Sequence, residues 1–143
     1  TAGNFYDSGG SGSDYSNDER KLWLFQPSGA TSISMNFTSF NLENAYDYLF
    51  IYDGNSTSAA LIGKYTSTVS PGSINSTGSS LLFEFRSDCA TTKPGWAATY
   101  TTNAVATSTS DGIVPTTSIS TVGAWKTANF TASFTDADLG GSG

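Results

Sequence analysis

A regular alternation of apolar and polar side chains runs through residues 31–40, which read TSISMNFTSF. Ile33, Met35 and Phe37 fall on one side of the chain, and serine, asparagine and threonine fall on the other. Successive side chains of a β-strand point to opposite faces of a sheet. The stretch therefore predicts a strand with one face in a core and the other in water.

Short apolar runs between turn signals predict further strands around this one. They are LWLF (residues 22–25), YLFIY (48–52), AALIGKY (59–65), SLLFEF (80–85) and GWAATY (95–100). The run YLFIY is apolar on both faces, which predicts a strand buried between two layers. Pro and Gly punctuate the gaps at a short, regular spacing that is typical of a sandwich. The sequence therefore predicts an all-β fold, an antiparallel β-sandwich with few or no helices.

The composition of the chain divides it into three parts. Residues 1–102 hold enough predicted strands for one complete sandwich, which begins with a loop or edge segment at residues 3–21. Residues 103–115, NAVATSTSDGIVP, are small and polar and predict a linker. Residues 116–143 alternate again but hold too few strands to close a core alone. We expect them to be the start of a second β-domain, in a chain that is a processed or excised piece of a longer protein.

The charge of the chain argues against several classes of partner. Its formal net charge is −6 and its pI is about 4.2, and its six Lys and Arg residues are scattered. Nucleic acids and anionic membranes are bound by clustered cations, so both are disfavoured. No apolar run approaches the length of about 18 residues that spans a membrane. An acidic surface instead suits cations, basic side chains of a protein partner or neutral glycans.

The inventory of reactive side chains argues against catalysis. The chain contains no His, which excludes Ser-His and Cys-His nucleophiles and His-ligated zinc. Cys89 is the only cysteine and has no evident activating partner in the sequence. Glu43, Asp47, Glu84 and Asp88 could supply a glycosidase pair, but nothing in their spacing requires one. We therefore predict no catalytic residue.

Carboxylates in the predicted loops could instead hold a hard cation. Calcium binds several oxygen ligands, and loops from different strands can converge at one end of a sandwich. Glu43 and Asp47 flank one short loop, and Asp88 begins another. Asp53, which precedes Gly54, is predicted to be a turn residue, roughly 20 Å from Asp47 at the other end of one strand. Acidic loop residues are also commonly solvated or cap turns, and the residues alone leave both readings open.

The order of several motifs resembles a CUB domain. FNLENAYDYLFIYDGNSTSAALIGKY (residues 40–65) contains the F-x-L-E segment, the Y-D pair and the D-G turn of that family. SINSTGSSLLFEFRSDCATTKPGWAATY (73–100) contains an apolar strand that leads into S-D, and a G-W before the last strand. The resemblance covers about residues 5–100. It implies a compact antiparallel sandwich and an extracellular binding module with no catalytic activity of its own.

The resemblance also implies a calcium site. In the calcium-binding branch of the family, the motif positions correspond to Glu43, Asp47 and Asp88, with Tyr15 as a supporting residue. Two departures affect this expectation. The four family cysteines are absent, and Lys21 and Thr66 stand where two of them would be. The loop from Glu43 to Asp47 is also shorter than is usual in the family.

The missing disulfides and the Gly- and Ser-rich opening resemble the CUB domains of secreted bacterial multidomain proteins. We therefore expect a secreted or cell-surface module that recognises a protein or glycan, for example in adhesion. One alternative is a carbohydrate-binding accessory module of a secreted enzyme that uses exposed aromatics, although Trp23, Trp96 and Trp125 all fall in predicted strands. Another alternative is a structural spacer.

Two further sets of residues have simple explanations. The chain has Asn-X-Ser/Thr sequons at Asn36, Asn55, Asn75 and Asn129, and a composition this rich in Ser and Thr explains them. Asp136 and Asp138 fall in a Gly-rich acidic segment, which is interpreted as a turn.

Overall fold

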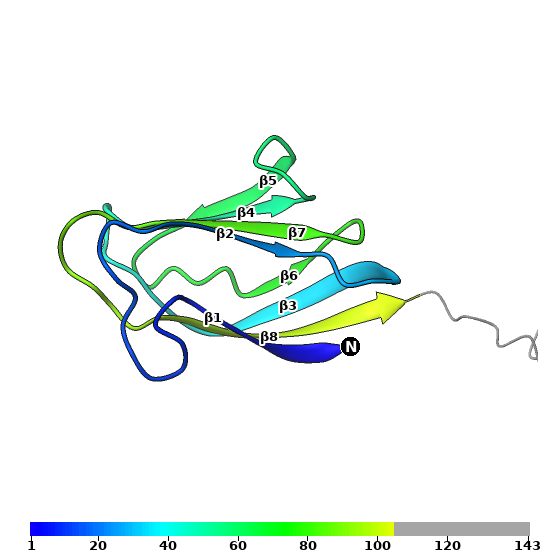
Figure 1. Ribbon diagram of the computed structural model, residues 1–143, viewed down its shortest axis with the longest axis horizontal. Coiled ribbons are helices and arrows are strands. Elements are labelled where there is room, and N and C mark those ends of the chain that lie inside the picture. Colours follow the sequence, from blue (N-terminus) through cyan, green and yellow to red (C-terminus); the bar gives the residue numbers. More distant parts are fainter. Residues whose placement is uncertain (105–143) are drawn as a thin grey trace, which may run out of the picture. The chain divides into compact units, whose positions relative to one another are not determined.

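A computed structural model of the protein describes residues 1–104, which form eight strands and no helix (Figure 1). In chain order the strands are β1 (Ala2–Tyr6), β2 (Arg20–Phe25), β3 (Ala30–Asn41), β4 (Tyr48–Asp53), β5 (Ala60–Tyr65), β6 (Ser73–Asn75), β7 (Leu81–Arg86) and β8 (Gly95–Ala104). The remaining residues lie outside this description. The predicted linker at 103–115 falls almost wholly there, as do the predicted second domain, Trp125 and the two aspartates of the predicted Gly-rich turn.

The strands form two four-stranded sheets that face each other as two layers (Figure 1). The strand order is β1-β8-β3-β6 in the first sheet and β2-β7-β4-β5 in the second. Every pairing in both sheets is antiparallel. The prediction of an antiparallel β-sandwich is confirmed.

The strand predicted from residues 31–40 lies in the middle of the first sheet as β3. Ile33, Met35 and Phe37 are buried as the alternation requires. The register with β8 shifts between Phe37 and Ser39. A shift of one residue turns the next side chains to the other face, so Phe40 also points into the core and is only 8% exposed. The bulge thus explains an apolar residue that the simple alternation leaves out of phase.

An aromatic cluster fills the space between the sheets. The ring of Phe5 lies 4.9–5.7 Å, centre to centre, from the rings of Trp23, Phe25, Phe83 and Trp96. These are edge-on or tilted contacts, which aromatic pairs favour. Large buried rings give a small sandwich an apolar core that helps to offset the absence of disulfides.

The opening segment, predicted to be a loop or an edge segment, contains both. Its first residues form the edge strand β1, which pairs with β8, and Phe5 and Tyr15 are both buried in the core. The short strand β6 was not predicted, because three residues give no readable periodicity. It pairs with β3 at Met35.

The prediction that YLFIY is buried between layers is wrong. Only Leu49 and Ile51 point into the core, while Tyr48, Phe50 and Tyr52 are half-buried on the outer face of the second sheet. Cationic side chains cover part of this aromatic row. The Lys64 ammonium lies 3.6 Å from the centre of the Tyr48 ring, and the Arg86 guanidinium lies 5.2 Å from that of Phe50. Cation–π contacts therefore shield an apolar face that would otherwise need a second layer.

Candidate metal centre

Three loops meet at one end of the sandwich and bring the predicted site residues together. Asp47 directly precedes β4, and Asp88 lies two residues beyond the end of β7. The strands β4 and β7 are paired neighbours, with Tyr48 opposite Arg86. The two aspartates are therefore adjacent because of the strand register, although they are 41 residues apart in the sequence.

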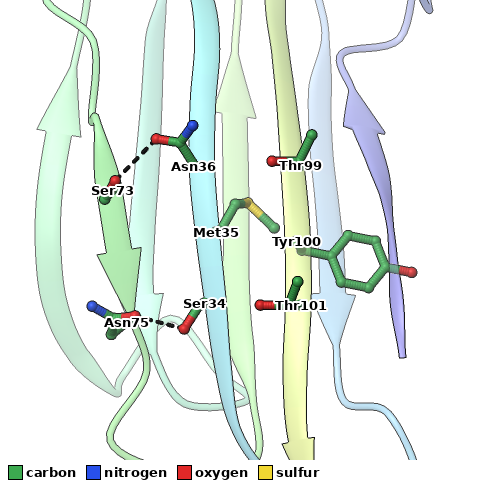
Figure 2. Close-up of a pocket in the computed structure, with 8 residues that line it drawn as sticks. All are labelled: Ser34, Met35, Asn36, Ser73, Asn75, Thr99, Tyr100 and Thr101. Atoms are coloured by element: carbon green, nitrogen blue, oxygen red, sulfur yellow. Dashed lines mark hydrogen bonds between the residues drawn. The ribbon is translucent and has the colours of Figure 1, made fainter.

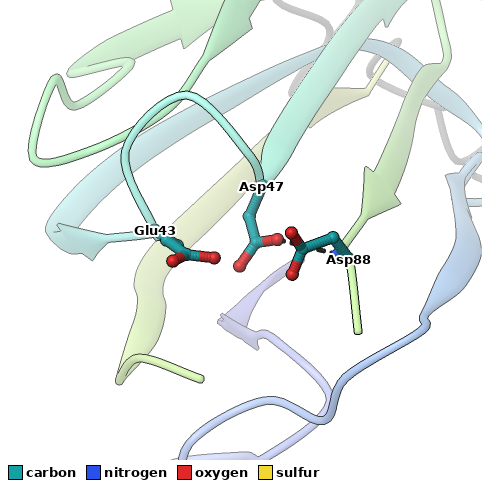
Figure 3. A group of neighbouring side chains, drawn as sticks. All are labelled: Glu43, Asp47 and Asp88. Atoms are coloured by element: carbon teal, nitrogen blue, oxygen red, sulfur yellow. Dashed lines mark hydrogen bonds between the residues drawn. The ribbon is translucent and has the colours of Figure 1, made fainter. Parts of the chain in front are cut away.

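The three predicted carboxylates converge at this end. Each of Glu43, Asp47 and Asp88 offers an oxygen, and these oxygens all lie within 4.8 Å of one another (Figure 3). Asp47 is fully buried, while Glu43 and Asp88 are half-buried. The cluster thus has one interior member and two members that reach the surface.

The short loop that carries Glu43 and Asp47 is closed by its own backbone and by Thr66. The Asp47 N–H donates to the Glu43 carbonyl at 3.3 Å, and Ala45 adopts a left-handed conformation with φ of 66°. The Thr66 hydroxyl donates to the same carbonyl at 3.0 Å and accepts the Ala45 N–H at 3.3 Å. The resemblance places a family cysteine at the position of Thr66. In this chain the Thr66 hydroxyl restrains the loop by hydrogen bonds instead of a disulfide.

Tyr15 connects two of the three acidic residues. Its hydroxyl donates to the Asp47 carboxylate and accepts the Glu43 N–H at 3.0 Å. The other oxygen of Asp47 accepts the Asp88 N–H at 2.9 Å. Burial, reinforced by the bond to Asp47, raises the pKa of the Tyr15 phenol above its ordinary value. The phenol therefore remains a protonated donor at neutral pH, and it orients Asp47 as the supporting role requires.

The chemistry of this cluster fits a hard divalent cation. Oε2 of Glu43 is buried and has no hydrogen-bond partner. Within residues 1–104, the two ion pairs involve other acids, Glu19 and Glu84, so no Lys or Arg neutralises the cluster. Three close carboxylates with an unpaired buried oxygen are costly unless a cation compensates them. An all-oxygen donor set is the kind that calcium prefers.

Asp7 and Glu19 are also buried, and Asp7 lies at the same end in a different environment. Asp7 is 5% exposed, and its two oxygens accept the N–H groups of Gly9 and Trp96, both at 2.8 Å. Burial raises the pKa of Asp7 despite these bonds, which act in the opposite direction. A Cβ at Gly95 would lie 2.1 Å from Asp7 Oδ2, so this position needs Gly. The sequence interpretation missed Asp7, although an Asp before Ser-Gly-Gly is a signal for a turn of this kind.

The remaining residues singled out from the sequence fall into structural roles. Asp53 lies at the far end of β4 from Asp47, and its carboxylate accepts the Thr77 N–H at 3.0 Å. Trp96 is 1% exposed, and Trp23 packs against it with ring centres 5.6 Å apart.

Cys89 is an exposed free thiol. In the described part of the chain, no helix could cross a membrane.

Comparison with known proteins identifies one family. The sequence pattern of the CUB domain matches residues 2–100. Cubilin of Homo sapiens is 33% identical over 91 residues, which are 61% of this chain and 2% of cubilin. The exoskeleton protein RP43 of Riftia pachyptila is 36% identical over 94 residues, which are 62% of this chain and 22% of RP43. The chain thus spans less than a quarter of the length of either relative.

Solved structures show the same architecture. The CUB2 domain of MASP-1, crystallised with Ca²⁺, superimposes with a TM-score of 0.59 at 22% identity. The match covers 69% of this chain and 90% of that domain. Domains of this kind are extracellular protein-binding modules without catalytic activity of their own, and calcium binding is frequent among them.

Proposed function

Because the chain belongs to the CUB domain family, we propose that it is an extracellular protein-binding module whose loop end holds one calcium ion. Glu43, Asp47 and Asp88 would be the ligands. One observation carries the proposal: two loops, β3–β4 and β7–β8, bring oxygens of these carboxylates within 4.8 Å of one another, and Glu43 Oε2 is buried without a hydrogen-bond partner.

The residues of the site divide into an anchor and two outer ligands. Asp47 is the anchor, because Tyr15 and the Asp88 N–H already hold both of its oxygens in place. Bound calcium would offset two of the three negative charges and hold the two loops together. This increases the stability of the folded state in proportion to the logarithm of the calcium concentration.

The two outer ligands would also be the contact with a partner. Glu43 and Asp88 are half-buried, so the edge of the site is open to another protein. Carboxylates that are oriented by an ion make strong, charge-assisted hydrogen bonds to Lys or Arg. We therefore propose that the partner presents a basic side chain to this end of the sandwich.

The setting of the module belongs to the same proposal. A secreted or cell-surface multidomain protein, of the disulfide-free bacterial type and with an adhesive role, would place such a module among further domains of the polypeptide. Residues 103–115 would be the linker to the next domain, and residues 116–143 its beginning.

The alternative of a glycan platform made from exposed aromatics receives little support from the described residues. Trp23 and Trp96 pack in the core. The outward rings of Tyr48 and Phe50 have cations over them, which occupy positions that a stacked sugar would need. Tyr46 is 63% exposed, but one ring does not make a platform. No observation favours the spacer alternative over the calcium module.

Retention on immobilised lysine tests the proposed contact. The wild-type protein is expected to be retained in millimolar calcium and released by a chelator. Asp47→Asn should abolish the calcium-dependent part. Asp53→Asn is the matched control, because it makes the same chemical change at the other end of β4, where no second carboxylate is grouped with it.

Either of two results would contradict the proposal. One is retention that is the same in calcium and in chelator. The other is equal loss of retention in Asp47→Asn and Asp53→Asn, because general acidity would then explain the binding.

A further inference from the structure

The two sheets differ sharply in charge. No Asp, Glu, Lys or Arg lies on β1, β8, β3 or β6. All the charged strand residues of the described chain belong to the second sheet: Arg20, Lys21, Asp53, Lys64, Glu84 and Arg86. Exposed strands commonly carry charges for solubility and to discourage edge pairing. The first sheet therefore presents an unusual outer face, which is polar but neutral.

A depression of about 300 Å³ lies on this neutral face. Its polar lining comes from three neighbouring strands: Ser34 and Asn36 on β3, Ser73 and Asn75 on β6, and Thr99 and Thr101 on β8 (Figure 2). The volume lies at the lower end of the range of about 300–1,000 Å³ that is usual for small-ligand sites.

Two hydrogen bonds fix the orientation of the amides in the depression. The Ser34 hydroxyl donates to Oδ1 of Asn75 at 2.7 Å, and the Ser73 hydroxyl donates to Oδ1 of Asn36 at 2.9 Å. Each amide therefore uses its oxygen within the protein. Figure 2 shows both amide nitrogens turned away from the paired serines. Two oriented N–H₂ donors are left for an external acceptor.

The chemistry of the lining selects a class of ligand. The amide donors lie beside the Thr99 and Thr101 hydroxyls, which can both donate and accept, and the Ser34 and Ser73 oxygens, which can still accept. This combination matches a molecule with many hydroxyl groups. An ionic ligand would find no counter-charge on these strands, and an apolar ligand would leave the amides unpaired. Neighbouring strands lie about 4.8 Å apart, which is close to the length of one pyranose unit in an extended sugar chain.

We propose that this depression binds a neutral glycan, with Asn36 and Asn75 as its principal donors. A sugar chain that lies across β6, β3 and β8 would meet polar side chains on each strand. The proposed site uses no residue of the acidic cluster, so it needs no calcium. It provides the module with a second binding surface, independent of the loop end.

The test uses the full chain, produced in a bacterial cytoplasm so that the sequons at Asn36 and Asn75 carry no glycan. Binding to insoluble neutral polysaccharides, cellulose and a β-1,3-glucan, is measured by depletion in the presence of chelator. Asn36→Asp and Asn75→Asp keep an oxygen for the paired serine but remove the free donor. Asn55→Asp is the matched control, because it adds the same charge at an exposed position of the β4–β5 turn, next to the second sheet and away from the depression.

We expect the wild-type protein and Asn55→Asp to bind at least one of these polysaccharides. Asn36→Asp and Asn75→Asp should each bind at least 10-fold more weakly, with an unchanged melting temperature. Failure of the wild type to bind either polysaccharide would overturn the proposal, as would equal binding by all variants. Analytical sedimentation of the free protein tests whether a second copy of the chain occupies this face instead. A dimer that Asn36→Asp dissociates would assign the face to a second copy of the chain and overturn the glycan site.

Discussion

Asp7 and Asp47 are both buried aspartates at the same end of the sandwich, but their surroundings differ. Asp7 accepts two backbone N–H groups, those of Gly9 and Trp96. It also has a buried acidic neighbour, Glu19, but the Lys21 ammonium lies 3.8 Å from Glu19 Oε2 and compensates that charge. Asp47 also has both oxygens occupied, but the oxygens of Glu43 and Asp88 lie close by, and one of them has no partner. Burial alone therefore does not distinguish a structural carboxylate from a metal ligand. The distinction comes from the uncompensated negative charge around it.

The largest effect on the unfolding free energy is expected from Asp7→Ala. The substitution leaves two N–H groups without an acceptor, and the Trp96 N–H is buried. We expect a loss of about 3 kcal/mol, because bonds to a charged acceptor are among the stronger ones and burial of the charge offsets part of their contribution. The loss, measured by urea unfolding, should be the same in calcium and in chelator. A loss of stability seen only in calcium would mean that Asp7, like Asp47, contributes to calcium binding.

Asp47→Asn should abolish the response to calcium. At a concentration 100 times the dissociation constant, calcium is expected to stabilise the wild-type protein by about 2.7 kcal/mol. The variant should show no calcium-dependent rise in its melting temperature, whereas Asp53→Asn should keep the full rise. An equal rise in all three proteins would place the ion elsewhere.

Glu43→Gln should separate calcium binding from apo stability. The buried Oε2 makes no hydrogen bond, and the contacts of Glu43 to Tyr15 and Thr66 use its backbone. We expect at least about 10-fold weaker calcium binding, which corresponds to about 1.4 kcal/mol. In chelator we expect no loss of stability, because the substitution removes one of three close charges that no cation compensates. A large loss of apo stability would show that the carboxylate has a structural role like that of Asp7.

The smallest effect is expected from Tyr15→Phe, at about 1 kcal/mol. Asp47 loses one donor but keeps the Asp88 N–H, and the Glu43 N–H that loses its acceptor is only partly buried. The pKa of Tyr15 is raised in the folded state, so above about pH 10 the unfolded state binds fewer protons than the folded state. The stability of the wild-type protein should therefore fall as the pH rises beyond that value. The variant should show a shallower fall, and an unchanged slope would contradict the proposed environment of the phenol.

The sequence predicted the sandwich because period-two patterning is a local signal. Residues 31–40 carry it clearly, and they form the centre of β3. The outer face of β4 was mispredicted because the cations that cover it, Lys64 and Arg86, come from neighbouring strands. No pattern within YLFIY could reveal them.

The candidate site was predicted only in part. The residue types and the family resemblance named Glu43, Asp47, Asp88 and Tyr15, and the structure brings all four together. The role of Thr66 in closing the short loop depends on contacts between segments more than 20 residues apart. The neutral depression depends on the pairing of β3 with β6, a strand too short to be predicted from sequence.

Calorimetric titration of the wild-type chain with calcium, with Glu43→Gln and Asp7→Asn titrated in parallel, is the decisive test of a calcium site at Glu43, Asp47 and Asp88. We predict one calcium ion per chain for the wild type, similar binding by Asp7→Asn, and at least 10-fold weaker binding by Glu43→Gln. Absence of calcium binding by the wild-type chain, or equal binding by Glu43→Gln, would contradict the proposal that Glu43, Asp47 and Asp88 bind calcium.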